Sequence, residues 1–146
     1  MSYGPDEMRA TLRDVFAPWV QALGIEPVSQ DAEGATFRLP ASGAVARGGM
    51  DGPPVMCGQA IAAAADTCSA LTLWGLAGRF RNCTTVDLTV HFLRPVAAET
   101  AELRVTALSN GRRLATTRVE LRPVASDGSL GKLAAAATCA FAYLED

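Results

Sequence analysis

One acidic residue lies inside a long apolar stretch of the sequence. Residues 60–76 contain a single charged residue, Asp66, among alanines and larger apolar side chains. Removing an ionised carboxylate from water is costly, so a carboxylate in such a segment is either paired or used in a reaction. Asp66 is therefore a candidate general base or nucleophile. The alternative is that it only pairs with a nearby Thr, Ser or Arg.

Gly58 precedes Asp66 by eight residues, at the expected start of the same helix. The first amide N–H groups of a helix lack intrahelical partners and carry partial positive charge, so they can stabilise a developing oxyanion. Eight helical residues span about 12 Å, which is too far for one reacting carbonyl to reach both groups. Two antiparallel helices about a two-fold axis would bring Gly58 of one copy to Asp66 of the other. The spacing therefore predicts an obligate dimer.

The other chemically active residue types do not form a recognisable site. The four cysteines contain no CxxC pair, and His91 is the only histidine, so we expect reduced thiols and no metal. A nucleophilic Cys57 would need a base, and nothing in the sequence connects it with His91. Five arginines could bind phosphate groups, but each is individually more typical of a solvated surface charge: Arg79, Arg81, Arg94, Arg112 and Arg113.

The elements that must position Asp66 and Gly58 can be read from the periodicity. Residues 5–22 place Met8, Leu12, Val15, Phe16 and Trp19 at helical spacing, which predicts an amphipathic helix that Pro18 ends or bends. A hairpin with its turn at 32–34 and a Gly/Pro-rich loop over 40–54 follow, and the loop leads into the apolar helix.

Alternating apolar and polar residues predict long antiparallel strands in the second half of the chain. The strands fall at 84–94, 100–107, 115–122 and 130–143, with turns at Asn110-Gly111 and Asp127-Gly128. In the first of them Val86, Leu88, Val90 and Phe92 should form one buried face. Such a sheet can curl around a single helix, and the alanines of residues 60–65 would allow close approach.

Composition limits the class of protein and of partner. The 146 residues suit one domain, and 49% hydrophobic with 19% charged residues fits a compact globular protein. A net charge of -2 without charge clusters predicts no nucleic-acid or membrane-surface partner. The apolar run is short of the ~20 residues that span a bilayer and holds Asp66 near its centre, which argues against a membrane-spanning helix. The first 20 residues lack the apolar segment of a secretory signal. We therefore expect a soluble protein located in the cytoplasm.

Two stretches resemble a known family. The sequence VMCGQAIAAAADT at 55–67, followed by VDLTVHFLRP at 86–95, is similar to hot dog fold acyl-CoA thioesterases of the phenylacetate-degradation type. In that family the helix opens with His-Gly-Gly, and an acidic residue follows nine positions after the histidine. Cys57, Gly58 and Gln59 take the His-Gly-Gly places here, and Asp66 takes the acidic one. The resemblance covers roughly residues 35–143.

The resemblance implies an α+β hot dog fold, in which a curved antiparallel sheet wraps one long central helix. It implies a single domain over 1–146, with a core over 25–143 and an N-terminal helix within 1–24. It further implies a homodimer with sites between the subunits, which can pair into a dimer of dimers.

The implied activity is hydrolysis of a small to medium acyl-CoA, aromatic acyl groups included, without metal or bound cofactor. Gly58 would polarise the thioester carbonyl, and Asp66 would activate water or attack directly. Asp51 and Thr85 take positions that contact water or the acyl group, and Cys57 and Gln59 complete the implied substrate-binding set.

Two other functions fit the same sequence. One is hydration or dehydration of an acyl thioester on this fold, although related enzymes of that kind pair a His with an Asp or Glu. The other is a non-catalytic hot dog module that binds acyl-CoA or a protein partner, which the altered His-Gly-Gly places favour. Release of coenzyme A from an acyl-CoA panel would separate these functions.

Overall fold

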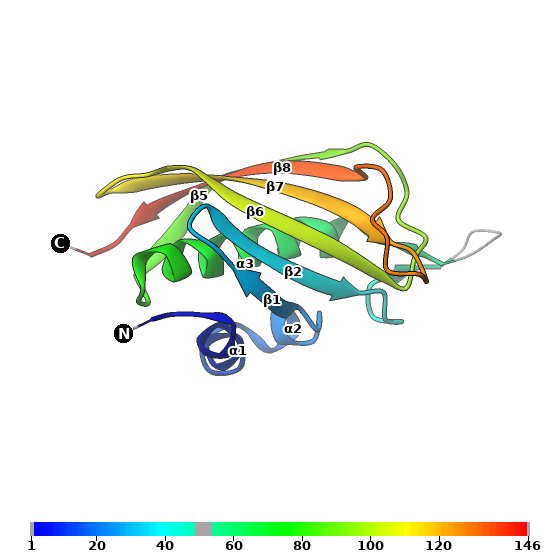
Figure 1. Cartoon of the computed structure of the whole chain (residues 1–146), viewed down its shortest axis with the longest axis horizontal. Coiled ribbons are helices and arrows are strands. Elements are labelled where there is room, and N and C mark those ends of the chain that lie inside the picture. The colour runs from blue at the N-terminus through cyan, green and yellow to red at the C-terminus, as the bar shows by residue number, and fades with distance from the viewer. Residues whose placement is uncertain (1, 49–53, 146) are drawn as a thin grey trace.

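A six-stranded antiparallel sheet wraps one long helix. The computed structural model describes residues 2–48 and 54–145. Helix α3 (Gly58–Ala77) lies against the concave face of the sheet (Figure 1). In spatial order the strands are β1 (Glu26–Gln30), β2 (Gly34–Pro40), β6 (Thr100–Asn110), β7 (Leu114–Val124), β8 (Ala135–Tyr143) and β5 (Cys83–Phe92). This arrangement is the expected hot dog fold.

Helix α3 is the core helix of the fold. Its buried alanines let the sheet come close, so that the Cys139 thiol lies 3.8 Å from the carbonyl oxygen of Ala65. Deeper in the core, the hydroxyls of Thr117 and Ser69 are hydrogen-bonded at 2.8 Å. The helix is long and apolar enough to cross a membrane, but 72% of its most apolar window is buried inside the protein. Gly78 ends it in the left-handed conformation, with φ of 72°.

The N-terminal segment forms two helices where one was predicted. Helix α1 (Pro5–Asp14) buries Met8 and Leu12, as expected for its apolar face. The chain then breaks, and Pro18 begins a second short helix, α2 (Pro18–Gln21), at a position where proline is well tolerated. The break changes the helical phase, so that Trp19 is 63% exposed and does not continue the buried face.

The turns agree with the sequence, and the long loop contains an unexpected element. Hairpins form around 32–34 and after Asn110, and Gly128 turns the chain with φ of 87°. The last strand begins at Ala135, later than the predicted start at residue 130. Strand β3 (Ala46–Arg47), within the predicted loop, pairs with β4 (Val55–Met56), which directly follows that loop. Strands of two residues are too short to show a period of two in the sequence.

Strand β5 does not bury the face that its alternation predicted. Val86 is 56% exposed, Leu88 37% and Phe92 55%. The strand lies at the edge of the sheet and, within 2–48 and 54–145, pairs only with β8. Its register with β8 also shifts between Thr85 and Asp87, which interrupts the alternation. Strand β5 therefore presents an unpaired edge and apolar side chains at the surface of the single chain.

Candidate active site

Asp66 lies where the middle of α3 faces the first residues of β5. Its carboxylate is half-buried and accepts a hydrogen bond from the Thr85 hydroxyl, with 2.6 Å between Oδ1 and Oγ1. Thr85 stands opposite Phe141 on β8, whose side chain is buried against α3, so Thr85 also points to the helix side of the sheet. The tertiary structure thus brings together two of the residues that the sequence singled out.

A cavity of about 370 Å³ opens beside this pair. Asp66 and Thr85 both line it, and most of its wall is apolar. A carboxylate held by one hydroxyl keeps its second oxygen available, and an apolar cavity next to it can hold the hydrocarbon part of a substrate. This arrangement suits the activation of a water molecule beside an apolar group.

Gly58 is the first residue of α3 and lines a different cavity of about 330 Å³. Its amide N–H has no hydrogen-bond acceptor among residues 2–48 and 54–145. A Cβ placed on Gly58 would lie 3.3 Å from Cζ of Phe92, so the end of β5 approaches the helix start closely. Arg47 and Arg94 line the same cavity and add positive charge to the helix N-terminus.

The remaining predicted residues lie near the helix start. Cys57 is half-buried, and its amide donates a hydrogen bond of 2.7 Å to the Val45 carbonyl, which fixes the entry of the chain into α3. Gln59 is exposed. Neither residue lines the two cavities described above. Asp51 lies outside the described residues.

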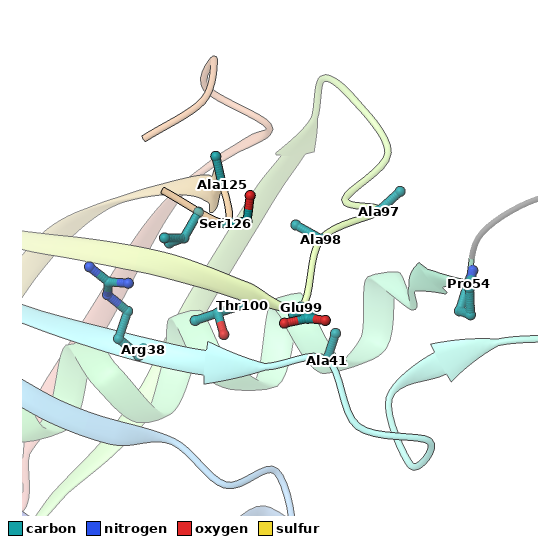
Figure 2. Close-up of a pocket in the computed structure, with 10 residues that line it drawn as sticks. Arg38, Ala41, Pro54, Ala97, Ala98, Glu99, Thr100, Ala125 and Ser126 are labelled. Carbon is teal, nitrogen blue, oxygen red and sulfur yellow. The ribbon is translucent and has the colours of Figure 1, made fainter. Parts of the chain in front are cut away.

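A larger cavity of about 620 Å³ lies elsewhere on the protein. Figure 2 shows Arg38, Glu99 and Thr100 around it, near the end of β2 and the start of β6. None of the predicted site residues that the structure describes lines this cavity. Arg38 is already paired there with Glu102 at 3.1 Å. The site expected from the sequence is therefore not at this larger cavity.

Two of the arginines considered as phosphate ligands are held by the protein itself. Glu145 pairs with Arg79 at 3.0 Å and with Arg81 at 2.5 Å. Hydrogen bonds from these guanidinium groups lower the pKa of Glu145. Arg81 also stacks over the ring of Tyr143. Arg94 at the Gly58 cavity donates a hydrogen bond of 2.8 Å to the Leu133 carbonyl but pairs with no carboxylate among the described residues, so it is a better-placed cation for an anionic ligand.

The sequence predicts only part of the aromatic wall beside Asp66. It places Trp74 and Phe80 in the core or a pocket wall, as found, but it places Phe16 and Trp19 on the packed face of the first helix. Phe16 and Trp19 come from the N-terminal segment, and Trp74 and Phe80 come from the end of α3 and the turn after it. Trp19 looked like a core residue because its spacing continues that of α1. Because the helix breaks before Pro18, the Trp19 side chain lines the cavity instead.

Comparisons with solved structures support the fold. A conserved protein of Pseudomonas aeruginosa is 26% identical, covers 90% of this chain and 98% of its own, and superposes with a TM-score of 0.73. A thioesterase of Haemophilus influenzae is 17% identical over 99% and 93% of the two chains, with a TM-score of 0.80. A thioesterase family protein of Silicibacter pomeroyi is 20% identical over 94% and 99%, with a TM-score of 0.77.

The sequence itself matches one family model. No curated protein matches this chain significantly. The model described as the acyl-CoA thioesterase N-terminal domain matches residues 52–142, which include α3 with Asp66 and all but the last residue of the four long strands that follow. The chain therefore belongs to the acyl-CoA thioesterase family of hot dog thioester hydrolases.

Proposed function

We propose that this protein hydrolyses the thioester of a small to medium acyl-CoA, aromatic acyl groups included, to the free acid and coenzyme A. The family supplies the reaction type, and the Asp66–Thr85 pair beside an apolar cavity is the observation that carries the assignment of the site. Asp66 is the proposed general base, and the amide of Gly58 is the proposed oxyanion donor.

The reaction follows from these two groups. Asp66 takes a proton from water as the water oxygen bonds to the carbonyl carbon, and the Thr85 hydroxyl holds the carboxylate in position. Negative charge develops on the carbonyl oxygen and is stabilised by the Gly58 N–H and the helix dipole. The carbon–sulfur bond then breaks, and the coenzyme A thiolate takes up the proton. No metal or cofactor is needed for these steps.

The proposed site is shared between two copies of the chain. Gly58 lies beside Phe92 near one end of β5, whereas Asp66 lies beside Thr85 near the other end. Antiparallel pairing of two β5 edges about a two-fold axis near Thr89 would bring the Phe92 end of one copy to the Thr85 end of the other. The pairing would also cover Val86, Leu88 and Phe92. One surface thus accounts for the unpaired edge, its apolar side chains and the distance between the two catalytic groups.

We further propose that residues 1–146 act as one hot dog domain in a cytoplasmic homodimer, which can pair into a dimer of dimers. Cys57 and Gln59 would contribute to the substrate site through the helix start, and Asp51 through the loop before it. The substitution of Cys57 for the usual histidine leaves the amide of Gly58 unchanged. For this reason we favour hydrolysis over a non-catalytic module. We favour it over hydration or dehydration because α3 holds no histidine to pair with Asp66.

The test is coenzyme A release from an acyl-CoA panel, followed with a thiol-reactive dye. We expect wild type to hydrolyse at least one acyl-CoA, and Asp66→Asn to lose about 10²-fold or more in kcat because the base is missing. Asn is nearly isosteric and can still accept the Thr85 hydrogen bond, so folding should be preserved. Equal rates for wild type and Asp66→Asn would contradict the role of Asp66, and binding without any release would favour the non-catalytic module.

A further inference from the structure

The cavity beside Asp66 is bounded by aromatic side chains from two distant parts of the chain. Trp74 and Phe80 form one wall, with 4.7 Å between their ring centroids. Phe16 packs against Trp74 with a centroid separation of 5.9 Å, and Trp19 lines the cavity from α2. The segment after α1, from Val15 to Val20, therefore contributes one side of this apolar compartment.

The two tryptophans that line this compartment differ in burial and in hydrogen bonding. The indole N–H of Trp74 donates a hydrogen bond of 2.6 Å to the carbonyl of Arg81, and its side chain is almost fully buried. Trp19, by contrast, is 63% exposed although it lines the cavity. A large aromatic side chain left in water beside a cavity gains free energy when an apolar ligand covers it.

Charge limits what the compartment can accept. Asp66 is the only charged residue among those that line it in the described part of the chain, and no cation accompanies it. Burial raises the pKa of the neighbouring Cys83 thiol, which stays neutral at physiological pH. A ligand group with its own carboxylate would be desolvated and repelled by Asp66, and the residues of the same copy that line the compartment supply no opposite charge to compensate.

We propose that Trp19 is a specificity-determining residue, which selects bulky, uncharged acyl groups by covering them with its exposed indole ring where it lines the cavity beside Asp66. This inference rests on the proposed thioesterase site at Asp66. The acyl group would pass between α2 and α3, while its thioester carbonyl stays near Asp66. Short acyl groups would not reach Trp19, and acyl groups that end in a carboxylate would be rejected.

The first test compares kcat/KM for three acyl-CoA probes. Hexanoyl-CoA is long and uncharged, acetyl-CoA is short, and glutaryl-CoA is similar in length to hexanoyl-CoA but ends in a carboxylate. We expect wild type to prefer hexanoyl-CoA to glutaryl-CoA by about 10²-fold. Trp19→Ala should lower kcat/KM for hexanoyl-CoA by about 10-fold, mainly through KM, and leave acetyl-CoA within about twofold. Trp19→Phe should keep most of the hexanoyl-CoA activity.

The control is Val28→Ala, which truncates an exposed apolar residue on β1 that does not line this cavity. It should leave the ratio of hexanoyl-CoA to acetyl-CoA activity unchanged. An equal loss for both probes in Trp19→Ala, or a glutaryl-CoA rate that matches the hexanoyl-CoA rate, would overturn the inference and leave the thioesterase proposal standing.

The second test does not need turnover. In an Asp66→Asn background, hexanoyl-CoA should shift the emission of the exposed Trp19 to the blue, and acetyl-CoA should not. Trp19→Phe should abolish the shift, because Trp74 is already buried. The chain has only these two tryptophans, so the assignment is direct. Absence of a shift with hexanoyl-CoA would refute the role of Trp19, even if wild type hydrolyses thioesters.

Discussion

At the scale of single residues, the amide of Gly58 can be removed without removing the helix start. Gly58 is the first helical residue, where proline is tolerated, and Cys57 before it is extended, with φ of -71° and ψ of 148°, as a residue preceding proline requires. Gly58→Pro deletes the N–H, whereas Gly58→Ala keeps it. Both variants add a Cβ at the same position close to Phe92. The pair of variants therefore separates hydrogen bonding from steric effects.

We expect Gly58→Pro to lower kcat by about 10²-fold, because one oxyanion donor is lost. Gly58→Ala should lose much less, since it retains the donor. Steady-state rates with the best acyl-CoA of the panel provide the measurement, and circular dichroism checks that α3 persists. Similar activity of the two variants would show that the amide of Gly58 does not stabilise the transition state.

At the scale of elements, the neighbouring strands β2 and β6 leave no room for a side chain at Gly34. A Cβ on this residue would lie 1.8 Å from the carbonyl oxygen of Val105, which is backbone and cannot rotate away. Gly34→Ala should therefore force the two strands apart and lower the free energy of unfolding by about 3 kcal/mol. Gly43→Ala is the matched control, because no atom lies within 4 Å of the Cβ position at Gly43. Urea denaturation of both variants would test the difference, and equal midpoints would contradict it.

The turn between β1 and β2 is tied to β6 by an ion pair. Arg104 donates two hydrogen bonds to Asp31, of 2.9 and 2.8 Å. The pKa of the Asp31 carboxyl is lowered from 3.8 to about 2, and the hydrogen bonds from Arg104 are the main cause. Because the pKa is lower in the folded state, this stabilisation is present above pH 4 and is lost as the pH falls through about 2.

We expect Asp31→Asn to be less stable than wild type at pH 6 and to approach the stability of wild type as the pH falls through about 2. The Asn side-chain oxygen can still accept the hydrogen bonds from the amides of Glu33 and Gly34, so the variant isolates the charge on residue 31. Urea midpoints measured every half pH unit would show the two curves converge. A constant difference between them would indicate that the ion pair does not contribute.

At the scale of the whole molecule, a site shared between subunits can be tested by complementation. In a mixed dimer of Asp66→Asn and Gly58→Pro, one site carries both substitutions and the other carries neither. Co-refolding equal amounts should therefore restore about a quarter of wild-type activity, because about half of the dimers are mixed and each holds one intact site. Refolding each variant alone is the control. No recovery from the mixture would mean that both groups act within one chain.

The sequence by itself determined the elements and the candidate groups. Helix α3, the hairpin turns and the long strands follow from periods of 3.6 and 2 and from turn residues, which act over a few neighbouring positions. Asp66 was identifiable as the only charge in an apolar run, and Gly58 from its place at the start of the same helix, to which the resemblance also points. The resemblance over residues 55–67 and 86–95 added the acyl-CoA thioesterase family, which the match over 52–142 bears out, and the phenylacetate-degradation type stays a prediction.

Only the tertiary structure decided what surrounds Asp66. The hydrogen bond from Thr85 depends on the register of β5, and the position of Trp19 depends on a helix break at Pro18, so neither could be read from local spacing. The order of strands in the sheet left β5 at an edge and exposed side chains that its alternation had marked as buried. These features arise from contacts between distant segments, and a local pattern carries no information about which segments will meet.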